Sequence, residues 1–244
     1  MIQRKALAVI PVRYGSTRFP GKPLAPIAGR PMIQRVVDGV RSCLLLDRVI
    51  VATDDERILG AVRSFGAEAV MTSASHASGT DRVAEVAEAH PYPVIINVQG
   101  DEPLVTGGML DGLVRALQDP EVPMASLMAR VTDMSTFNEP HRVKVVVDGA
   151  RNALYFSRAS IPHGAAGSFF QHIGIYGYQR EFLLHVRDLQ PSRLEQCEKL
   201  EQLRVLESGF KIRMIEVNRP TLSVDVPGDI IRVENFLRAQ GTHD

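Results

Sequence analysis

Residues 6–24, ALAVIPVRYGSTRFPGKPL, decide the fold, because an apolar run there is followed at once by a loop rich in glycine and proline. The run over residues 6–12 is short and wholly apolar, which is typical of a strand buried on both faces of a parallel sheet. The following residues, 13–22 (the first loop), then lie at the carboxyl end of that strand, where open α/β sheets bind their ligands. This segment therefore predicts both a fold class and the place of a ligand site.

The composition of the first loop suits a phosphate group. Arg13, Arg18 and Lys22 place three cations within ten residues. Arginine makes bidentate contacts with phosphate and lysine acts as a point charge, while Gly15 and Gly21 let backbone N–H groups approach closely. The pattern is neither GxxxxGK[ST] nor GxGxxG, and a solvated basic loop is the alternative. Pro20 in the loop, with Pro23 and Pro26 just after it, stiffens the chain there, which favours binding of a triphosphate.

The rest of the first half alternates strands with helices. Apolar runs predict strands over residues 48–52, 67–71 and 94–98, and helical spacing predicts helices over 31–46, from Thr53 onward and over 81–89. Thr53 and Glu56 have the spacing of a capping box at the start of the second helix. This order predicts an α/β fold with a Rossmann-like, mostly parallel sheet flanked by helices, connected by right-handed crossovers.

The second half is richer in strands. We expect strands over residues 143–147, 153–157, 172–178 and 210–217, and a closing helix over 230–237. Ser192 and Glu195 have capping-box spacing, and the helix that they begin continues through a stripe formed by Leu194, Cys197, Leu200, Leu203 and Leu206. We predict a single domain over residues 1–244, with a β-rich lobe inserted near residues 130–180.

Composition excludes several classes of protein. The 244 residues are 45% hydrophobic, enough for a sizeable core, and 28 basic residues balance 28 acidic ones. Without a basic excess we expect no nucleic-acid partner. The first apolar run ends near Pro11, too short to span a membrane, so we expect a cytoplasmic protein with no membrane partner. Cys43 and Cys197 form no CxxC pair and fall in apolar helical patterns, which predicts core thiols.

Two acidic motifs are candidates for a metal site. Asp101 follows the fourth strand in NVQGDEP, a position where carboxylates hold Mg²⁺ together with substrate phosphates. Glu102 is a candidate outer partner, and the alternative is that Asp101 or Glu102 caps the next helix. Asp225, in SVDVPGDI, is either a second metal ligand or a charge at a helix N-terminus. The spacing alone leaves both interpretations of Asp225 open.

Polar groups in the second half are candidates for binding a polyhydroxy ligand. In a strand with a period of two, His172, Gly174, Tyr176 and Tyr178 share one face, so an imidazole and two phenols point the same way. A satisfied histidine beside packed aromatic rings is the alternative, and spacing does not decide between them.

The remaining candidates rest on weaker patterns. Arg158 is a cation directly after a strand, and Glu201 and Gln202 lie beside the leucine stripe, where a solvated helix surface is the alternative that spacing favours. A serine- and glycine-rich loop before a helix contains Ser78 and Gly79, and such a loop can offer backbone contacts to a base or a ribose.

Eight segments, in order, resemble the 3-deoxy-manno-octulosonate cytidylyltransferase family, also called CMP-Kdo synthetases. They are IPVRYGSTRFPGKPL, VATDDER, SGTDR, NVQGDEP, VKVVVD, ALYFSRASIP, HIGIYGY and LEQLRVLESG. The resemblance covers about residues 6–238 and implies the fold of nucleotide-diphospho-sugar transferases. It also implies the reaction of CTP with Kdo to give CMP-Kdo and diphosphate, with Mg²⁺, in a cytoplasmic homodimer serving lipopolysaccharide biosynthesis.

The resemblance assigns roles to individual residues. It implies that Arg13, Arg18 and Lys22 bind the phosphates, that Gln99, with Ser78 and Gly79, lies near the nucleotide, that Asp101 and Asp225 bind the metal, and that Arg158, His172, Tyr176, Glu201 and Gln202 bind the sugar. In the same way, it implies that the inserted lobe carries the sugar site and the dimer contact.

The chain departs from the family in two places. Where the family usually reads GVDTPEDL, this chain reads SVDVPGDI, so Val226 and Gly228 remove any hydrogen bonds that the usual threonine and glutamate supply around the metal ligand. The segment over residues 162–171 is also shorter than usual. Two rival functions remain: the same chemistry on 8-amino-3,8-dideoxy-octulosonate or a sialic acid, and a non-catalytic nucleotide-binding regulator with the same fold.

Overall fold

The structure is a computed structural model, and it describes residues 4–15 and 18–241. Its strands are β1 Ala6–Val12, β2 Pro26–Ile27, β3 Arg30–Pro31, β4 Arg48–Thr53, β5 Ala69–Met71, β6 Val94–Asn97, β7 Met124–Val131, β8 Lys144–Val147, β9 Ala153–Ser157, β10 Phe169–Gln179 and β11 Ile212–Val217. The α-helices are α1 Met32–Arg41, α2 Glu56–Ser64, α3 Gly79–Ala89, α4 Gly107–Ala116, α5 Arg180–Asp188, α6 Arg193–Glu198, α7 Gln202–Glu207 and α8 Pro227–Ala239. Short 3₁₀ turns, η1 and η2, span Lys22–Leu24 and Met134–Thr136.

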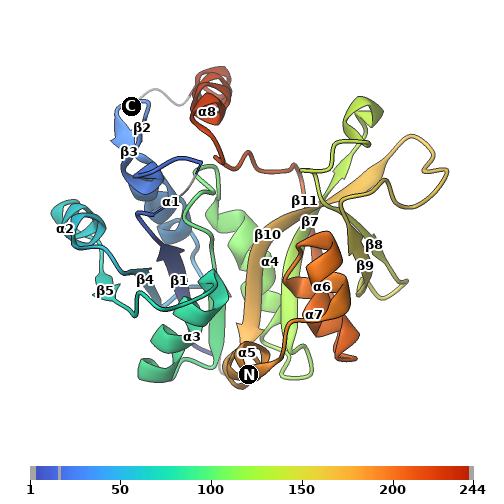
Figure 1. The fold of residues 1–244 in the computed structure, drawn as a ribbon, viewed down its shortest axis with the longest axis horizontal. Coiled ribbons are helices and arrows are strands. Elements are labelled where there is room, and N and C mark those ends of the chain that lie inside the picture. Colours follow the sequence, from blue (N-terminus) through green and yellow to red (C-terminus); the bar gives the residue numbers. More distant parts are fainter. Residues whose placement is uncertain (1–3, 16–17, 242–244) are drawn as a thin grey trace.

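One mixed sheet organises the molecule, with the strand order β11-β7-β10-β6-β1-β4-β5 (Figure 1). β1 pairs in parallel with β4 and β6, β4 with β5, and β11 with β7. β10 is antiparallel to both of its neighbours, β6 and β7. Every residue of β1 is buried, as the apolar run predicts for a strand covered on both faces. The predicted α/β class with a mostly parallel sheet is confirmed.

Helices cover both faces of the sheet because successive side chains of each strand point in opposite directions. Ala8 and Ile10 of β1 belong to the core under α1, α2 and α4. Leu7 and Val9 of the same strand belong to the core that α3, α5 and α7 cover. α8 lies apart from these layers, at the end of the molecule near β2 and β3, where Val233 packs in a small third core (Figure 1).

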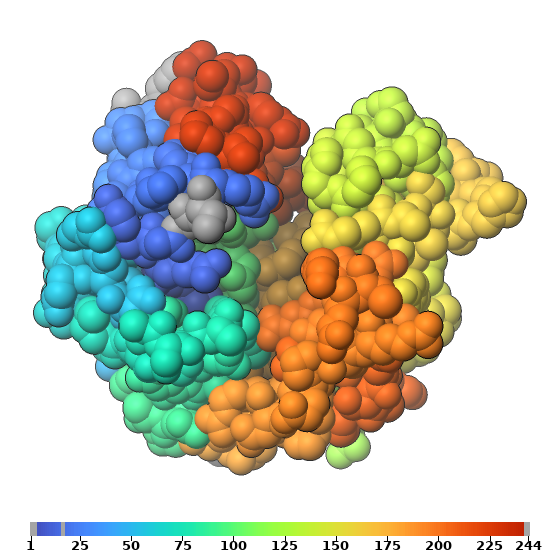
Figure 2. Space-filling view, in the orientation of Figure 1, coloured from blue at the N-terminus to red at the C-terminus, as the bar shows by residue number. Residues whose placement is uncertain are grey.

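A hairpin of β8 and β9 extends the sheet away from the main strand path. β8 also pairs with β10, so the hairpin continues from the middle of the sheet. The residues near 130–180 therefore include both this hairpin and β10, which lies inside the central sheet between β6 and β7. Figure 2 shows a hollow between the N-terminal half with α8 on one side and the hairpin with α6 and α7 on the other.

The structure corrects the predicted start of α2 and the predicted end of α1. Asp55, rather than Thr53, caps α2, and its side chain accepts the N–H of Arg57 at 2.9 Å. Asp55 stands directly before the helix with an extended backbone, so its carboxylate reaches the free N–H groups first. α1 ends at Arg41, five residues before the end that the pattern predicts.

The predicted helix through the leucine stripe is two helices rather than one. Its capping box is confirmed, since Ser192 and Glu195 bond each other's backbone N–H groups. Lys199 then adopts a left-handed conformation with a φ of 56°, which ends α6. Because the chain turns there, Cys197 is exposed, and the prediction that it is a core thiol is wrong. Cys43 is buried as predicted.

Candidate active site

Contacts of Gly21 and Tyr14 hold the first loop in place. Gly21 has a φ of 71°, and its N–H donates to the carbonyl oxygen of Tyr14 at 3.1 Å. The Tyr14 ring packs against Gly21 on one side, and the Arg57 guanidinium carbon lies 3.3 Å from the ring centroid. The alternative of a disposable solvated loop is therefore not supported for the part that the structure describes. The loop's residues 16–17 lie outside the described residues.

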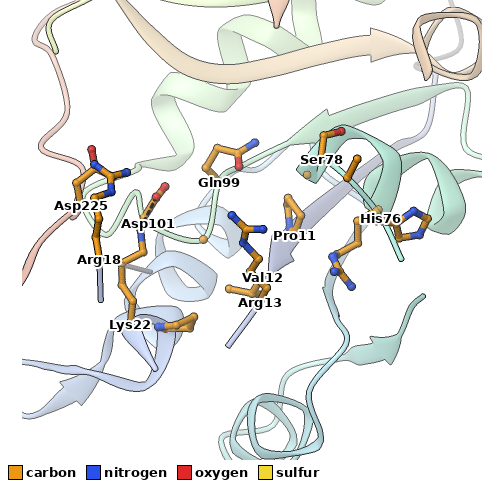
Figure 3. A pocket seen from close by; sticks show the side chains of 15 residues that line it. Pro11, Val12, Arg13, Arg18, Lys22, His76, Ser78, Gln99, Asp101 and Asp225 are labelled. Carbon is orange, nitrogen blue, oxygen red and sulfur yellow. Dashed lines mark hydrogen bonds and ion pairs between the residues drawn. The ribbon is translucent and has the colours of Figure 1, made fainter. Parts of the chain in front are cut away.

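Two cations of the first loop pair with the two predicted metal carboxylates (Figure 3). Lys22 Nζ donates to Asp101 Oδ2 at 2.7 Å and to the carbonyl oxygen of Val224 at 2.8 Å. Arg18 Nη2 donates to Asp225 Oδ1 at 3.0 Å. The N–H of Val224 donates to the carbonyl oxygen of Asp101 at 3.0 Å. Three segments far apart in the sequence thus meet at one charged cluster.

Asp101 occupies a tight turn at the end of β6 and is not a helix cap. The next helix, α4, has Thr106 as its N-cap, five residues further on. Gly100 allows the turn, since a Cβ there would lie 2.5 Å from Cγ1 of Val12. The neighbouring Glu102 is fully buried, and burial together with the Asp101 carboxylate raises its pKa to about 8.

The Asp225 carboxylate likewise does not cap a helix. Asp229 serves that purpose instead, because its Oδ2 accepts the N–H groups of Asp225 at 2.9 Å and Val226 at 3.0 Å. The cap at the start of α8 is thus present although Val226 and Gly228 depart from the family pattern. The Asp225 side chain points toward Arg18 and the cleft (Figure 3).

The cleft beside the first loop, which we call the first cleft, has two chemically different ends. Arg18, Lys22, Asp101 and Asp225 gather at one end, and Ser78 lies toward the other (Figure 3). The lining of the first cleft also includes Arg13, His76, Gly79, Arg82 and Gln99. The arrangement gives an extended ligand one end where two ion pairs gather and another end formed by the start of α3.

Gln99, Ser78 and Gly79 meet within the first cleft, as expected for residues that share one ligand. A Cβ on Gly79 would lie 3.3 Å from Oε1 of Gln99, so the amide is next to the helix start. The Ser78 hydroxyl accepts the N–H of Asp81 at 3.1 Å within the capping box of α3. The structure thus brings these three residues together, and their contact with a nucleotide stays a prediction.

A second cleft lies beside the first, and both share Gln99, Asp101 and Asp225. The additional lining of this second cleft includes His172 and Tyr176 from β10 and Gln202 from α7. The two acidic residues therefore lie where two ligand spaces meet. That position suits groups that act on a bond formed between two substrates.

Away from the acidic residues, the lining of the second cleft includes neutral, hydrogen-bonded groups. His172 Nε2 lies 2.9 Å from the Ser126 hydroxyl, and burial lowers the pKa of the imidazole to about 3. The Tyr176 hydroxyl donates to Gln202 Oε1 at 3.2 Å, and Gln202 Nε2 is buried without a partner among the described residues. The predicted shared face is found, since the rings of Tyr176 and Tyr178 lie 6.3 Å apart.

Two predicted sugar-binding residues lie outside the lining of both clefts as the described residues form them. Glu201 accepts a hydrogen bond from the Thr80 hydroxyl at 3.0 Å, and burial raises the pKa of its carboxyl. The Arg158 guanidinium donates to the backbone carbonyls of Glu198, Lys199 and Pro140. Their contact with a sugar stays a prediction.

The donor set fits a magnesium ion that is shared with a substrate. The described residues contain no group of three or more His, Cys, Asp or Glu side chains arranged to hold a metal. Asp101 and Asp225 offer two hard oxygen ligands instead. Mg²⁺ is usually held by one or two carboxylates, with waters and substrate phosphates completing its coordination. The donor set therefore suits a substrate-bridged ion better than a preformed cage, and the magnesium site stays a prediction.

Sequence reasoning passed over Arg82, which also lines the first cleft. Its side chain is almost fully buried and donates to the Asp54 carboxylate. One signal was present in the sequence, since Arg82 ends the SGTDR segment one helical turn after Ser78. Nothing in that spacing indicates that the guanidinium reaches a cleft.

Comparison with known proteins places the chain in a family. Residues 7–212 match the family model described as cytidylyltransferase. A 3-deoxy-manno-octulosonate cytidylyltransferase from Syntrophotalea carbinolica is 49% identical over 95% of this chain and 98% of its own length. A relative of the same name from Myxococcus xanthus is 50% identical, over 97% of this chain and 98% of its own. The chain belongs to the 3-deoxy-manno-octulosonate cytidylyltransferase family.

Solved structures agree with this membership. A CMP:2-keto-3-deoxy-manno-octonic acid synthetase complexed with CTP is 41% identical, covers 97% of this chain and 99% of its own, and has a TM-score of 0.92. A 4-diphosphocytidyl-2C-methyl-D-erythritol synthase from Anaerococcus prevotii, 11% identical with a TM-score of 0.66, shares the fold alone. The prediction of a nucleotidyltransferase enzyme is confirmed. No described helix is both long enough and apolar enough to cross a lipid bilayer.

Proposed function

We propose that this enzyme activates Kdo with CTP, giving CMP-Kdo and diphosphate for lipopolysaccharide biosynthesis. The supporting observation is that two neighbouring clefts, one with the three cations of the first loop and the other with neutral hydrogen-bonding groups, share the Asp101 and Asp225 carboxylates. The names of the relatives, and the CTP bound to the structure with a TM-score of 0.92, point to the same pair of substrates.

The first cleft accounts for the nucleotide. The guanidinium groups of Arg13 and Arg18 and the ammonium group of Lys22 neutralise the triphosphate, which otherwise repels the two carboxylates. Mg²⁺ held by Asp101 and Asp225 would add positive charge at the α-phosphate. Each of these carboxylates already faces a cation in the structure, so a triphosphate can take over the cations as it binds.

The second cleft accounts for the sugar acid. His172, Tyr176 and Gln202 offer hydrogen-bonding groups without net charge, which suits hydroxyl groups of a sugar. The anomeric hydroxyl attacks the α-phosphorus, the bond to the β-phosphate oxygen breaks, and diphosphate leaves. The hydroxyl proton passes to solvent. The chain contributes chiefly position and charge stabilisation, as is usual for transfer of a phosphoryl or nucleotidyl group.

The test is a panel of sugar acids with CTP and Mg²⁺, scored by release of diphosphate. We expect the highest kcat/KM with Kdo, and lower values with 8-amino-3,8-dideoxy-octulosonate and with a sialic acid. A preference for either of the other sugars would overturn the substrate. No release with any of the three would favour the non-catalytic regulator. Omitting Mg²⁺ should abolish release, and full activity with a chelator would contradict the metal.

We propose in addition that the enzyme works as a cytoplasmic homodimer, as the family resemblance implies. Light scattering coupled to gel filtration should then give about twice the chain mass of 26.9 kDa. A monomer that retains full activity at the same concentration would contradict a functional dimer.

A further inference from the structure

Lys144 of β8, in the VKVVVD segment, is a buried charge that the proposed function does not use. It is 0% exposed, and lysines are almost never fully buried without partners. Its ammonium group donates to the carbonyl oxygens of Arg158 at 2.7 Å and of Glu139 at 3.0 Å. Burial lowers the pKa of this group, and attraction to the Glu198 carboxylate acts in the opposite direction. Lys144 thus joins two segments, because its removal would leave two carbonyl oxygens without this donor.

Glu198, the last residue of α6, makes complementary contacts with one of these segments. Its carboxylate accepts hydrogen bonds from the Ser157 hydroxyl at 2.6 Å and from the N–H of Arg158 at 2.9 Å, where β9 ends. Its carbonyl oxygen accepts a hydrogen bond from Arg158 Nε at 2.8 Å, and the carbonyl oxygen of Lys199 accepts one from Arg158 Nη2 at 3.4 Å. The end of α6 is therefore fixed to the end of β9 through both side chains and backbone.

The segments that Lys144 and Glu198 hold continue into the lining of the second cleft. The lining residues that adjoin these segments are His141, Val143, Leu200 and Gln202. Because Lys199 turns the chain with a φ of 56° and α7 begins at Gln202, the end of α6 determines where Gln202 lies. Gln202 Nε2 is buried without a partner among the described residues, so it suits a ligand oxygen. A shift of about 1 Å in such a group weakens its contact with a ligand.

We propose that Lys144 and Glu198 are positioning residues for the sugar acid, which together hold the α6–α7 joint and residues 139–143 at the spacing that the second cleft requires; this inference rests on the proposed function. As the described residues form the two clefts, neither side chain lines them. The effect of both therefore acts through lining residues, chiefly Gln202. In the described part of the chain, the first cleft takes no lining residue from these segments, so CTP should bind independently of them.

The test compares the KM for Kdo with the KM for CTP in Glu198→Gln, Lys144→Met and the double variant. Glutamine keeps the size of Glu198 but turns an NH₂ donor toward one of the two donors that the carboxylate binds, and methionine removes the charge of Lys144. We expect the KM for Kdo to rise about 10-fold in each single variant, with the KM for CTP within about twofold. In the double variant the rise should be smaller than the product of the single rises, because both side chains act on one joint.

Glu216→Gln is the matched control, since Glu216 pairs with Arg151 at the closed end of the same hairpin. It should leave both KM values unchanged, whatever its effect on Tm. In Glu198→Gln, equal rises in the two KM values, or a lower Tm with unchanged KM values, would overturn the inference and leave a purely structural role. Glu198→Gln decides alone where Lys144→Met does not fold.

Titration calorimetry with Kdo separates this inference from the proposed function. The Kd for Kdo should rise in the variants as the KM does, and an unchanged Kd would contradict a positioning role. A wild-type enzyme that binds Kdo but releases no diphosphate with CTP would defeat only the proposed function, because the Kd values still test Lys144 and Glu198.

Discussion

The two clefts that share Asp101 and Asp225 are built on opposite physical principles. At the charged end of the first cleft, ions pair near solvent, and the Arg18 side chain is 64% exposed. In the second cleft, neutral groups bond one another out of water, and His172 is 8% exposed. Exposed pairs are individually weak and are easily exchanged for a charged ligand. Buried neutral groups hold their geometry instead, because leaving any of them unpaired is costly.

Asp101, which belongs to both clefts, should show the largest effect of any single substitution. Asp101→Asn keeps the size of the side chain but removes a charge that would hold Mg²⁺ at the reacting phosphate. We expect kcat to fall on the order of 100-fold or more, since even outer partners of metal ligands cost 10- to 100-fold. Rates of diphosphate release with saturating substrates measure this. Unchanged thermal unfolding serves as the control, and near-normal turnover would refute the metal assignment.

A substitution in the second cleft should have a smaller effect, which is confined to the KM for the sugar acid. Tyr176→Phe removes the hydroxyl that donates to Gln202 at 3.2 Å and leaves Gln202 Oε1 without that partner. We expect the KM for the sugar acid to rise by roughly 10-fold, while the KM for CTP stays within about twofold. Steady-state titration of each substrate distinguishes the two. An equal rise in both KM values would contradict the separation of the clefts.

A buried histidine of the second cleft should also make the stability of the folded protein sensitive to acid. Burial lowers the pKa of His172 from its ordinary value of 6.5 to about 3 in the folded state. Between these pH values the unfolded chain binds more protons than the folded one, so stability rises with pH over this window and falls on acidification. We expect His172→Gln to lose less Tm than the wild type between about pH 6.5 and pH 4.5. Parallel losses would show that other groups dominate.

The smallest effect is expected for a substitution of Arg18, the exposed cation of the first cleft. Arg18→Gln removes one ion pair with Asp225 and one phosphate contact, both screened by solvent. The KM for CTP should rise only a few-fold, and the difference from wild type should shrink as salt rises from about 0.01 M to 0.15 M. A defect that is independent of salt would mean that Arg18 acts in a desolvated site.

The first loop and its strand were predictable because the signals are local. A wholly apolar run followed by glycines and cations is enough to identify β1 and a charged loop at its end, whose contact with phosphates stays a prediction. The capping box at Ser192 was predictable for the same reason. The break at Lys199 was not, since a left-handed residue depends on how α7 packs after α6. The sequence pattern predicted no helix at α4 or α5 and no strand at β7. β7 nevertheless lies inside the sheet.

The sequence predicted which side chains are candidates for the site, but it did not predict which residues those side chains pair with. It identified Asp101 and Asp225 without their pairing to Lys22 and Arg18. It also identified Arg158, whose guanidinium instead donates to three backbone carbonyls. Arg82 was passed over because its place at the first cleft depends on a hydrogen bond to Asp54, 28 positions away. Such pairings come from strand order, which local patterns do not specify.

The sequence by itself determined the class of fold, the charged loop after β1 and the family, because apolar periodicity, glycine positions and motif order are all local properties of the chain. Tertiary structure alone decided that the first loop, the end of β6 and the start of α8 converge on one charged cluster. For the first loop and the end of β6, the physical reason is that β1 and β6 are neighbouring parallel strands that end at one edge of the sheet. The start of α8 joins them through the long connection after β11, where the N–H of Val224 donates to the carbonyl oxygen of Asp101. That convergence gives the loop over residues 13–22 its two carboxylate partners.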